Sequence, residues 1–555
     1  MRLLLISLLL SLFQNDYAQE FIYAQQAGGS FDGNNFNDAA HSIALDHEGN
    51  VFITGDVIGA SGMNAVFGKG QPNETTLTIN GMFVAKYNPS GQLLWVRQGG
   101  SITGFGITTD KSGNCYVTGK FSNQALFGEG QPNETVLDGT FGEIFIAKYD
   151  PNGYLQWAKS AGGSKDGDSG FSIVTDAASG VYITGSIEDG AIFGKGEVSE
   201  KTVTDLGYKI FAAKYSSDGN FLWVHVLATG QGNGLSIAVD KNSNVVLCGG
   251  DGNSFVLSKL TNNGLLVWSI IPFTESAGGV HGLTIDSEDN IYLTGDFWGS
   301  ATFGTGPNKI ILTGLGVNDF FIAKYKADGQ NVWAKSAGGP GFDRGLSVAM
   351  DFQNSVYVTG YFNDELTFAS KNAVKLIGDG DFDMFVAKYT YYGDLLWATN
   401  SGGTGNEEGK GIAVDSEGNS YVAGYFNSKN LVFGKGETAQ QTFSASGFND
   451  IYYSKFKAST DYILSASGEG SDIDWKIFPN PGLNEITLTM NLQDTGPIRI
   501  WIRDCSGKEI INTSQFPNSN EHTARINLSG QPSGLYLIHL QTGSSNYYKK
   551  FIKSN

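Results

Sequence analysis

An aspartate and a lysine recur together seven times along this 555-residue chain. In six units the Lys follows the Asp after 37 to 40 residues, and in the fourth unit after 19. The pairs are Asp46 and Lys86, Asp110 and Lys148, Asp176 and Lys214, Asp240 and Lys259, Asp286 and Lys324, Asp351 and Lys388, and Asp415 and Lys455. Aspartate opens tight turns by bonding its own backbone. We therefore expect seven structural turns rather than seven active sites, each Asp paired at partial exposure with its Lys for about 0–1 kcal/mol.

Histidine gives little sign of catalysis in this sequence. The six His residues follow no HExxH spacing, and no Gly-x-Ser-x-Gly elbow is present. His225 and His281 flank the shortened fourth unit. A lone His is more often a surface or core residue than a catalyst, so the sequence assigns no catalytic residue.

Acidic residues follow several Gly-Gly pairs, where they could be read as metal ligands. They are Asp166, Asp168, Asp343, Glu407 and Glu408. Calcium is conceivable, but no Asp-x-Asp-x-Asp-Gly loop is present. We interpret these acids as solvated surface residues, and the Gly-Gly pairs as close crossings between units rather than a phosphate cradle.

Cysteine usage gives neither a zinc site nor a disulfide framework. The three cysteines, Cys115, Cys248 and Cys505, show no zinc-like spacing. We expect Cys115 and Cys248 to be unpaired, because they fall on strands of non-adjacent units. No metal and no cofactor is predicted.

Composition restricts the class of partner and the type of fold. The formal charge is −19, which disfavours nucleic-acid binding. The chain has 76 glycines and 12% aromatic residues, which is typical of short strands joined by tight turns. A period near 64 residues, repeated seven times, indicates a closed or stacked array of one supersecondary unit.

Each unit contains four strand-like runs. In unit six they are residues 345–350, 356–362, 384–389 and 395–399. A tryptophan recurs on the fourth run, where a large aromatic would pack between neighbouring sheets. These residues are Trp95, Trp157, Trp223, Trp268, Trp333 and Trp397. The pattern predicts an all-β, seven-bladed β-propeller of four-stranded antiparallel blades, whose closure removes exposed sheet edges.

The fourth run occurs in two further copies that lack tryptophan, and either could complete the seventh blade. One is residues 21–25 and the other is residues 462–466. We favour the N-terminal copy, because the Ala27-Gly28-Gly29 exit seen after the other fourth strands follows it.

The connection between the second and third strands is about twenty residues long and carries Phe-Gly-x-Gly, as in residues 67–70. It should emerge on the face opposite the tight turns, and insertions gathered on one face of a repeat array usually mark the binding face. The fourth unit lacks this connection, which predicts a notch. We hypothesise that a ligand sits in or beside the notch; its identity is open.

The units resemble the SBBP-type β-propeller repeats of bacteria. The matching segments are residues 110–119 (Asp-x-x-Gly-Asn-x-Tyr-x-Thr-Gly), the Phe-x-Ala-Lys-Tyr segments, and residues 157–163 (Trp-Ala-Lys-Ser-Ala-Gly-Gly). The resemblance covers about residues 21–467. It implies a propeller fold and an exported location, and it implies no single activity.

The N-terminal end of the sequence predicts export. Residues 1–18 read as a signal peptide, with Arg2, an eleven-residue apolar core and Ala18 before the mature start. That core is too short to span a bilayer, and no other apolar run approaches spanning length. The mature chain is therefore expected to have no transmembrane span.

The C-terminal end predicts a second domain. A propeller over residues 19–467 and a linker over 468–474 precede residues 475–555, whose alternating runs suggest a small Ig-like β-sandwich. This part resembles the type A C-terminal sorting domain of the type IX secretion system of Bacteroidetes. The resemblance rests on Phe478, Pro479, Asn480 and Pro481, on the turn-strand with Gly534 and Tyr536, and on a basic tail. It implies that the type IX machinery is a partner.

Taken together, the sequence favours an exported, cell-surface or secreted β-propeller that acts in non-catalytic binding, adhesion or display, with a glycan or protein ligand. The alternative is an extracellular enzyme that degrades polysaccharide or peptide on the loop-rich face. Paired acids, or an acid with His225 or His281, in one pocket would favour the enzyme. A shallow pocket of Gly, Asn and aromatic residues would favour binding. Release or anchoring and the oligomeric state are left open.

Overall fold

The computed structural model of the chain divides into two compact units along the sequence, with the division at residues 458 and 459. Each is described by itself. The structure describes residues 20–29, 37–58, 64–78, 81–100, 102–139, 142–163, 167–204, 207–250, 255–274, 278–368, 374–457, 475–478, 485–491, 497–504, 509–515, 521–532, 534–542 and 545–553.

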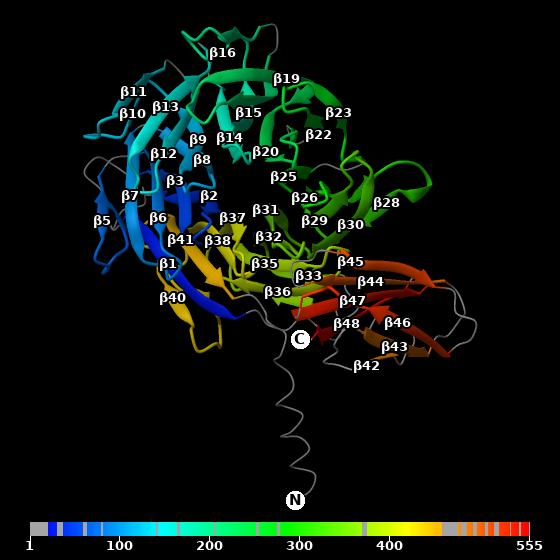
Figure 1. Ribbon diagram of the computed structural model, residues 1–555. Helices are drawn as coiled ribbons and strands as arrows, with labels where there is room; N and C mark the ends of the chain where they lie inside the picture. The colour runs from blue at the N-terminus through cyan, green and yellow to red at the C-terminus, as the bar shows by residue number, and fades with distance from the viewer. Residues whose placement is uncertain are drawn as a thin grey trace, which may run out of the picture. The chain divides into compact units, whose positions relative to one another are not determined.

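The first unit is an all-β, propeller-like fold, as the sequence predicts. Its described part contains seven sets of four antiparallel strands that are neighbours in a sheet, named here sheets one to seven in chain order. Figure 1 shows them arranged in a ring, with the first strand of each sheet at the centre. A single 3-10 turn, Gly306–Asn308, interrupts the strands among these residues.

The strand bounds follow the repeat closely. Sheets one to three are β2 (Ala39–Leu45), β3 (Val51–Val57), β6 (Gly81–Tyr87), β7 (Leu93–Gly100); β8 (Ile102–Thr109), β9 (Cys115–Phe121), β12 (Glu143–Tyr149), β13 (Leu155–Ala161); and β14 (Ser169–Thr175), β15 (Val181–Ile187), β18 (Lys209–Tyr215), β19 (Phe221–Gln231). Sheets four to six are β20 (Asn233–Val239), β21 (Val245–Gly250), β22 (Phe255–Leu260), β23 (Leu266–Ile270); β25 (Gly278–Ile285), β26 (Ile291–Phe297), β29 (Asp319–Tyr325), β30 (Asn331–Gly338); and β31 (Arg344–Met350), β32 (Val356–Phe362), β35 (Asp383–Tyr389), β36 (Leu395–Ser401).

Sheet seven joins the two ends of the first unit. It consists of β37 (Glu407–Val414), β38 (Ser420–Phe426), β41 (Asp450–Phe456) and the N-terminal strand β1 (Phe21–Gly29). Strand β1 pairs antiparallel with β41, from Phe21 opposite Phe456 to Ala27 opposite Ile451. The N-terminal copy of the fourth strand therefore completes this sheet, as predicted. The competing copy, residues 462–466, lies outside the described residues.

Short hairpins occupy the long connections between second and third strands. They are β4 (Ala65–Phe67) with β5 (Thr75–Leu77), β10 (Gln124–Phe127) with β11 (Thr135–Asp138), β16 (Ile192–Phe193) with β17 (Lys201–Thr202), β27 (Ser300–Phe303) with β28 (Ile310–Thr313), β33 (Glu365–Phe368) with β34 (Val374–Ile377), and β39 (Leu431–Phe433) with β40 (Gln441–Phe443). Several extend the outer strand of the preceding sheet, as β4 does for β1 and β33 for β30. Sheet four has only four residues between β21 and β22, and the sheet five hairpin pairs instead with β24 (Phe273–Thr274).

The recurring Asp and Lys meet between the strands on the tight-turn face. Lys86 Nζ lies 3.3 Å from Asp46 Oδ2, and Lys259 Nζ lies 2.9 Å from Asp240 Oδ2 in the shortened sheet four. Six of the seven predicted pairs form ion pairs among the described residues, and Lys148 instead donates to Ser217 O. The expected partial exposure is wrong for most pairs, because neighbouring sheets cover them; Lys324 and Asp286 are both buried. Removing one partner of such a pair leaves an unpaired buried charge.

The fourth-strand tryptophans of sheets one to five hydrogen-bond to the next sheet, whereas Trp397 of sheet six is buried with no partner for its Nε1 among the described residues. Trp95 Nε1 donates to Pro151 O at 3.1 Å, and Trp157 Nε1 donates to Ser217 O at 3.1 Å. In sheet seven Tyr23 takes this position, and its hydroxyl donates to Pro89 O at 3.2 Å. The predicted packing role is confirmed, and it extends to the sheet that lacks tryptophan.

The second unit is also all-β. Its strands are β42 (Trp475–Phe478), β43 (Glu485–Asn491), β44 (Ile498–Asp504), β45 (Glu509–Gln515), β46 (Glu521–Asn527), β47 (Gly534–Thr542) and β48 (Ser545–Lys553). They form one sheet of order β42-β43-β46 and one of order β45-β44-β47-β48 around an apolar core. The sequence analysis missed β45, whose Glu509–Gln515 segment ends in polar residues. Across the described residues of both units, no helix has the length and apolarity to cross a membrane.

Candidate functional site

A β-bulge recurs at the same place in the first strand of all seven sheets. The pairing register shifts around one residue in each, for example between Ala40 and Ser42 in β2 and between Val280 and Gly282 in β25. A bulge re-aims the side chain of its extra residue. We call these seven residues the bulge ring: His41, Phe105, Phe171, Leu235, His281, Leu346 and Lys410.

The bulge ring lines a small cavity that residues from the first strands of all seven sheets enclose. The cavity volume is about 150 Å³, below the roughly 300–1,000 Å³ of typical small-molecule sites. It can therefore take one side chain, one sugar ring or one small polar group. The bulges lie near the beginning of each first strand, on the side of the long connections.

Three members of the bulge ring are polar, and each is held by an acid. His41 Nε2 lies 2.8 Å from Asp56 Oδ1, and His281 Nε2 lies 2.7 Å from Asp296 Oδ1. Lys410 Nζ donates to a carboxylate oxygen of Glu408 at 2.6 Å. The acids come from the second strand beside each His and from the strand that carries Lys410. They orient the polar groups without covering them.

Around the polar members lie further side chains with donors and planar faces. Arg344 Nε lies 3.6 Å from Asp296 Oδ1, and the Tyr425 hydroxyl donates to Glu408. On the other side, the rings of Phe105 and Phe171 lie 5.1 Å apart. Of the bulge-ring residues that line the cavity, those of sheets five, seven and one are polar, those of sheets two and three are aromatic, and those of sheets four and six are aliphatic.

An acid and a histidine do converge at this cavity, which is the arrangement that favours an enzyme. The sequence analysis named His281 for it and missed His41, which has the same pairing. His225 lies on β19, the outer strand of sheet three, away from the bulge ring. In the described part of the chain neither His41 nor His281 is hydrogen-bonded to a hydroxyl or thiol that could act as a nucleophile.

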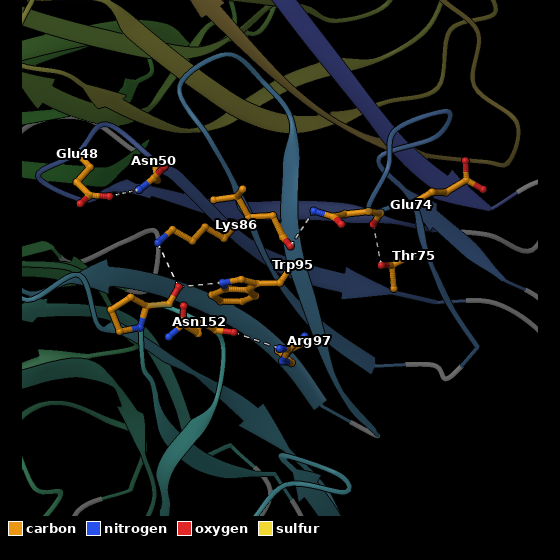
Figure 2. A pocket seen from close by; sticks show the side chains of 11 residues that line it. Glu48, Asn50, Glu74, Thr75, Lys86, Trp95, Arg97 and Asn152 are labelled. Carbon is orange, nitrogen blue, oxygen red and sulfur yellow. Dashed lines mark hydrogen bonds between the residues drawn. The ribbon is translucent and has the colours of Figure 1, made fainter.

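A larger groove of about 680 Å³ lies between the turns of sheets one and two. Figure 2 shows that its polar side chains bond to the protein itself. Lys86 Nζ and Trp95 Nε1 both donate to Pro151 O, and Arg97 Nε donates to Gly153 O at 2.7 Å. These groups hold the two sheets together, so the groove is a structural joint despite its size.

The acids that follow the Gly-Gly pairs are buried, and the interpretation as solvated surface residues is wrong for Asp168, Asp343 and Glu407. Glu408 is partly buried, and Asp166 lies outside the described residues. Each buried acid begins a sheet and accepts a hydrogen bond from the second glycine that ends the preceding one. These bonds are Gly163 N to Asp168 at 2.8 Å, Gly339 N to Asp343 at 2.7 Å and Gly403 N to Glu407 at 2.7 Å.

Asp38 is a fourth acid of this kind, and the sequence analysis missed it. Gly29 N donates to its Oδ2 at 3.0 Å. Burial raises the pKa of Asp38 to about 7, of Asp343 to about 8 and of Glu407 to about 7. The same desolvation raises the pKa of Asp168 to about 6. Each of these carboxyl groups is therefore harder to ionise in the folded protein than in water.

The predicted notch at sheet four leaves an apolar strand uncovered. In sheets one, two, three and seven a turn from the long connection covers the first residue of the outer strand, and Leu93 is only 2% exposed. Leu266 holds that position in sheet four and is 51% exposed. The connection itself, residues 251–254, lies outside the described residues.

The sorting-motif residues are only partly described. Pro479, Asn480 and Pro481 lie outside the described residues, and Phe478 ends β42. Gly534 begins β47. The Tyr536 ring stacks on Phe551 at 5.2 Å, and its hydroxyl donates to Pro532 O at 2.7 Å. Cys115 and Cys248 are free, as predicted, and Cys505 lies outside the described residues.

Two protein families match parts of the chain. Residues 476–554 match the secretion system C-terminal sorting domain. Residues 396–431 match the β-propeller repeat. Both matches agree with the resemblances seen in the sequence. The sorting domain is an export signal for the type IX machinery, so the protein is secreted or displayed at the cell surface.

Similarity to individual proteins is weaker. An uncharacterized WD repeat-containing protein of Acanthamoeba polyphaga mimivirus is 25% identical over 447 residues, which cover 72% of this chain and 30% of the viral protein. The chain thus matches less than a third of that relative's length. A Dyadobacter fermentans protein of unknown function has 9% identity and a TM-score of 0.32, covering 78% of this chain and 98% of its own. A fungal alcohol oxidase in complex with copper has 11% identity and a TM-score of 0.33, covering 97% and 100%.

Proposed function

We propose that this protein is a non-catalytic binding protein of the cell surface or external medium, and that its ligand is a glycan held at the bulge ring. In this proposal residues 1–18 are a signal peptide, and residues 19–467 form a closed propeller of seven blades. Residues 475–555 form an Ig-like sorting domain behind the 468–474 linker. The observation that carries the binding role is the recurrence of one bulge residue per sheet around a single small cavity.

The side chains of the cavity mouth suit a sugar. Sugar hydroxyl groups donate to and accept from charged planar groups, which Arg344, Glu408 and the two His–Asp pairs supply. Apolar faces of a sugar ring pack on aromatic rings, which Phe105 and Phe171 supply. The cavity volume fits one ring, so an oligosaccharide would insert one unit and lie with the rest across the loop-rich face.

A glycan array with the full chain tests this proposal. Lys410→Met and Phe171→Ala should each weaken binding at least tenfold, because they remove a polar and an aromatic member of the ring. Thr75→Ala in the groove between sheets one and two is the matched control, and it should bind like the wild type. Equal binding by all variants would refute the site, and capture of a protein with no glycan bound would refute the ligand class.

The His281–Asp296 pair keeps an enzyme as the second candidate. A positioned His with an acid can move a proton in hydrolysis or elimination of a polysaccharide. Incubation of the full chain with each array-positive glycan separates the two functions. New reducing ends or unsaturated sugars that disappear in His281→Gln would establish the enzyme, whereas recovery of intact glycan supports binding.

The notch at sheet four is a second candidate surface for the ligand. Exposed Leu266 favours it, since the equivalent residues of sheets one, two, three and seven are covered. Grafting a full connection between β21 and β22 should then reduce glycan binding. If binding survives the graft and is lost in Lys410→Met, the ligand sits at the bulge ring alone.

A further inference from the structure

The turn that covers the outer strand has the same form in sheets one, two, three and seven. Its sequence is Gly-x-Gly followed by Gln or Glu, and its first glycine lies on the first residue of the outer strand. A Cβ on Gly68 would lie 2.8 Å from the Cβ of Leu93, and a Cβ on Gly194 would lie 2.7 Å from the Cβ of Phe221. These turn glycines also have φ values of 62 to 65°. Only glycine suits this close approach at such a backbone conformation.

The Gln or Glu of the turn accepts a hydrogen bond from the main chain of the outer strand. This bond runs from Leu93 N to Gln71, from Leu155 N to Gln131, from Phe221 N to Glu197 and from Phe21 N to Glu437, at 2.6 to 2.8 Å. The same side chain can reach the preceding sheet, because Glu197 Oε1 lies 3.5 Å from Lys159 Nζ. The turn therefore covers an apolar residue, accepts from a main-chain donor and meets a polar side chain across the joint.

Sheet four has the outer strand that receives such a turn, but the turn is missing. Leu266 is the one exposed residue at this position in the seven sheets, since Asn331 and Leu395 in sheets five and six are half-buried. No side chain of the described residues accepts a hydrogen bond from Leu266 N. An apolar side chain and a main-chain donor are thus left open together.

The polar partner across the joint is also present at sheet four. His225 on β19 holds the position that Lys159 has on β13, two residues after the tryptophan, and lies beside Gly264. An imidazole N–H can donate to a Gln or Glu oxygen. Leu265 and Val267 are exposed on either side of Leu266, so three consecutive apolar residues face solvent. A contiguous apolar patch of this kind is typical of an interaction surface.

The connection of sheet four itself is too short to cover Leu266. Strands β21 and β22 pair at Gly250 and Phe255, so the four residues between them can extend roughly 7 Å beyond that pair. Leu266 pairs with Leu260, five residues further along β22, which is about 17 Å away. The opening is therefore a consequence of chain length.

The inner part of the notch is closed by the protein. In sheet three Phe193 of the hairpin packs on Phe211 of the third strand, with ring centroids 5.3 Å apart. Val256 holds the position of Phe211 in sheet four, and it is buried in one cluster with Leu227 of β19. The part left open is the start of β23, so the missing cover is the glycine turn and not the phenylalanine before it.

We propose that the start of β23, together with His225, is a docking site for a partner protein that presents a Gly-x-Gly turn followed by Gln or Glu. The turn would cover Leu266, and its Gln or Glu oxygen would accept from Leu266 N and from His225. The four turns of this sequence in the chain already lie on their own sheets, so the occupant is a different protein and not a second copy. The site is separate from the bulge ring and independent of a glycan there.

A capped, fluorescently labelled peptide with the sequence of residues 68–75 tests the proposal by anisotropy with the full chain. We expect one peptide per chain. Gln71→Met in the peptide removes the acceptor and Leu266→Asp in the protein removes the apolar contact, so each should weaken binding about tenfold or more. Lys69→Gln in the peptide and Val332→Asp in the protein are the matched controls, because both side chains are exposed. Both controls should bind like the wild type.

A graft makes the test independent of peptide affinity. Replacing residues 251–254 of the full chain with residues 58–80 would hold the same turn beside Leu266 at high effective concentration. Hydrogen–deuterium exchange of the Leu266 amide should then slow about tenfold or more, because the amide gains an acceptor. The same graft carrying Gln71→Met should leave this exchange fast.

Lys410→Met should bind the peptide like the wild type, which separates this site from the proposed glycan site. Equal exchange of the Leu266 amide with and without the graft would overturn the proposal, as would peptide binding that survives Leu266→Asp. Dimerisation of the full chain that Leu266→Asp abolishes would assign the surface to a second copy instead. Displacement of the peptide by an array-positive glycan would assign it to the sugar.

Discussion

The Asp–Lys pairs between sheets allow a matched test of how burial sets the strength of an ion pair. Asp286 and Lys324 lie 3.8 Å apart with side chains 0% and 2% exposed, and Asp415 and Lys455 lie 3.9 Å apart with side chains 13% and 12% exposed. Both aspartates make the same turn bonds, to two main-chain N–H groups, an asparagine and a tyrosine. The two pairs differ in the burial of both partners, and Lys324 also lies over the Tyr391 ring.

We expect Asp286→Ala to lower the free energy of unfolding by more than Asp415→Ala. At about 4 Å a unit charge pair is worth ~4 kcal/mol at an effective dielectric constant near 20 and ~1 kcal/mol in water. The turn bonds lost are the same, so the difference between the variants reports the charge interaction of the more deeply buried pair. It should approach about 3 kcal/mol, within the 3–5 kcal/mol range for breaking a buried pair.

Urea unfolding followed by tryptophan fluorescence measures both variants. The double variant Asp286→Ala with Lys324→Met should recover most of the difference, because it also removes the buried charge that Asp286 balances. Equal losses for the two aspartates would refute the reasoning, since they would show that the turn bonds, and not the buried charge, set the cost. Failure of Lys324→Met to rescue Asp286→Ala would refute it independently.

Three further outcomes follow from burial at other positions. Burial raises the pKa of Asp168 to about 6, so this carboxyl binds its proton more tightly in the folded state than in the unfolded chain. The resulting stabilisation of the folded state is complete below about pH 4 and is lost as the pH rises to about 6. Asp168→Asn cannot ionise and should lose this part of the dependence of melting temperature on pH; an unaltered profile contradicts it. Leu93→Ala should cost about 2–4 kcal/mol in urea unfolding, whereas exposed Leu266→Ala should cost less than about 0.5 kcal/mol, and equal costs would show that the notch is covered. Tyr536→Ala should lower the free energy of unfolding of the sorting domain by about 3–5 kcal/mol, and the variant protein should stay inside the cell. Tyr536→Phe should be exported. Normal export of both variants would show that export does not depend on packing at Tyr536.

The sequence predicts the repeat and its strands well because one physical rule acts in every unit. A turn aspartate, a lysine near the end of the third strand and a tryptophan on the fourth recur at fixed spacings, and each has a local structural reason. Even the strand that completes sheet seven could be chosen, since its Gly28-Gly29 exit follows the pattern of the other fourth strands. The register and pairing of the strands then follow from the alternation of side chains along each strand and from the short turns that join the strands.

The candidate site was harder to predict because its residues change type from unit to unit. His41, Phe105, Leu235 and Lys410 differ in chemistry, yet each lies five residues before a turn aspartate. The bulge that unites them depends on pairing between strands, which composition does not reveal. The buried acids were misread for a similar reason: Gly-rich loops are usually solvated, and only the crossing of two sheets covers Asp343 and Glu407.

The pairing of β1 with β41 also constrains when the first unit can finish folding. The contact of β1 with the β39–β40 hairpin just before β41, between Ala24 and Gln441, spans 417 residues, whereas a contact within one sheet, such as Thr359 with Phe385, spans 26. Sixteenfold more chain amounts to four doublings, or about 2.4 kcal/mol of extra loop entropy at about 0.6 kcal/mol each. While the chain emerges vectorially, strands can join their near neighbours early, but β1 waits until the last repeat arrives. A peptide fused to the amino terminus, or trimming into residues 21–29, would therefore disturb the final step of assembly more than any earlier one.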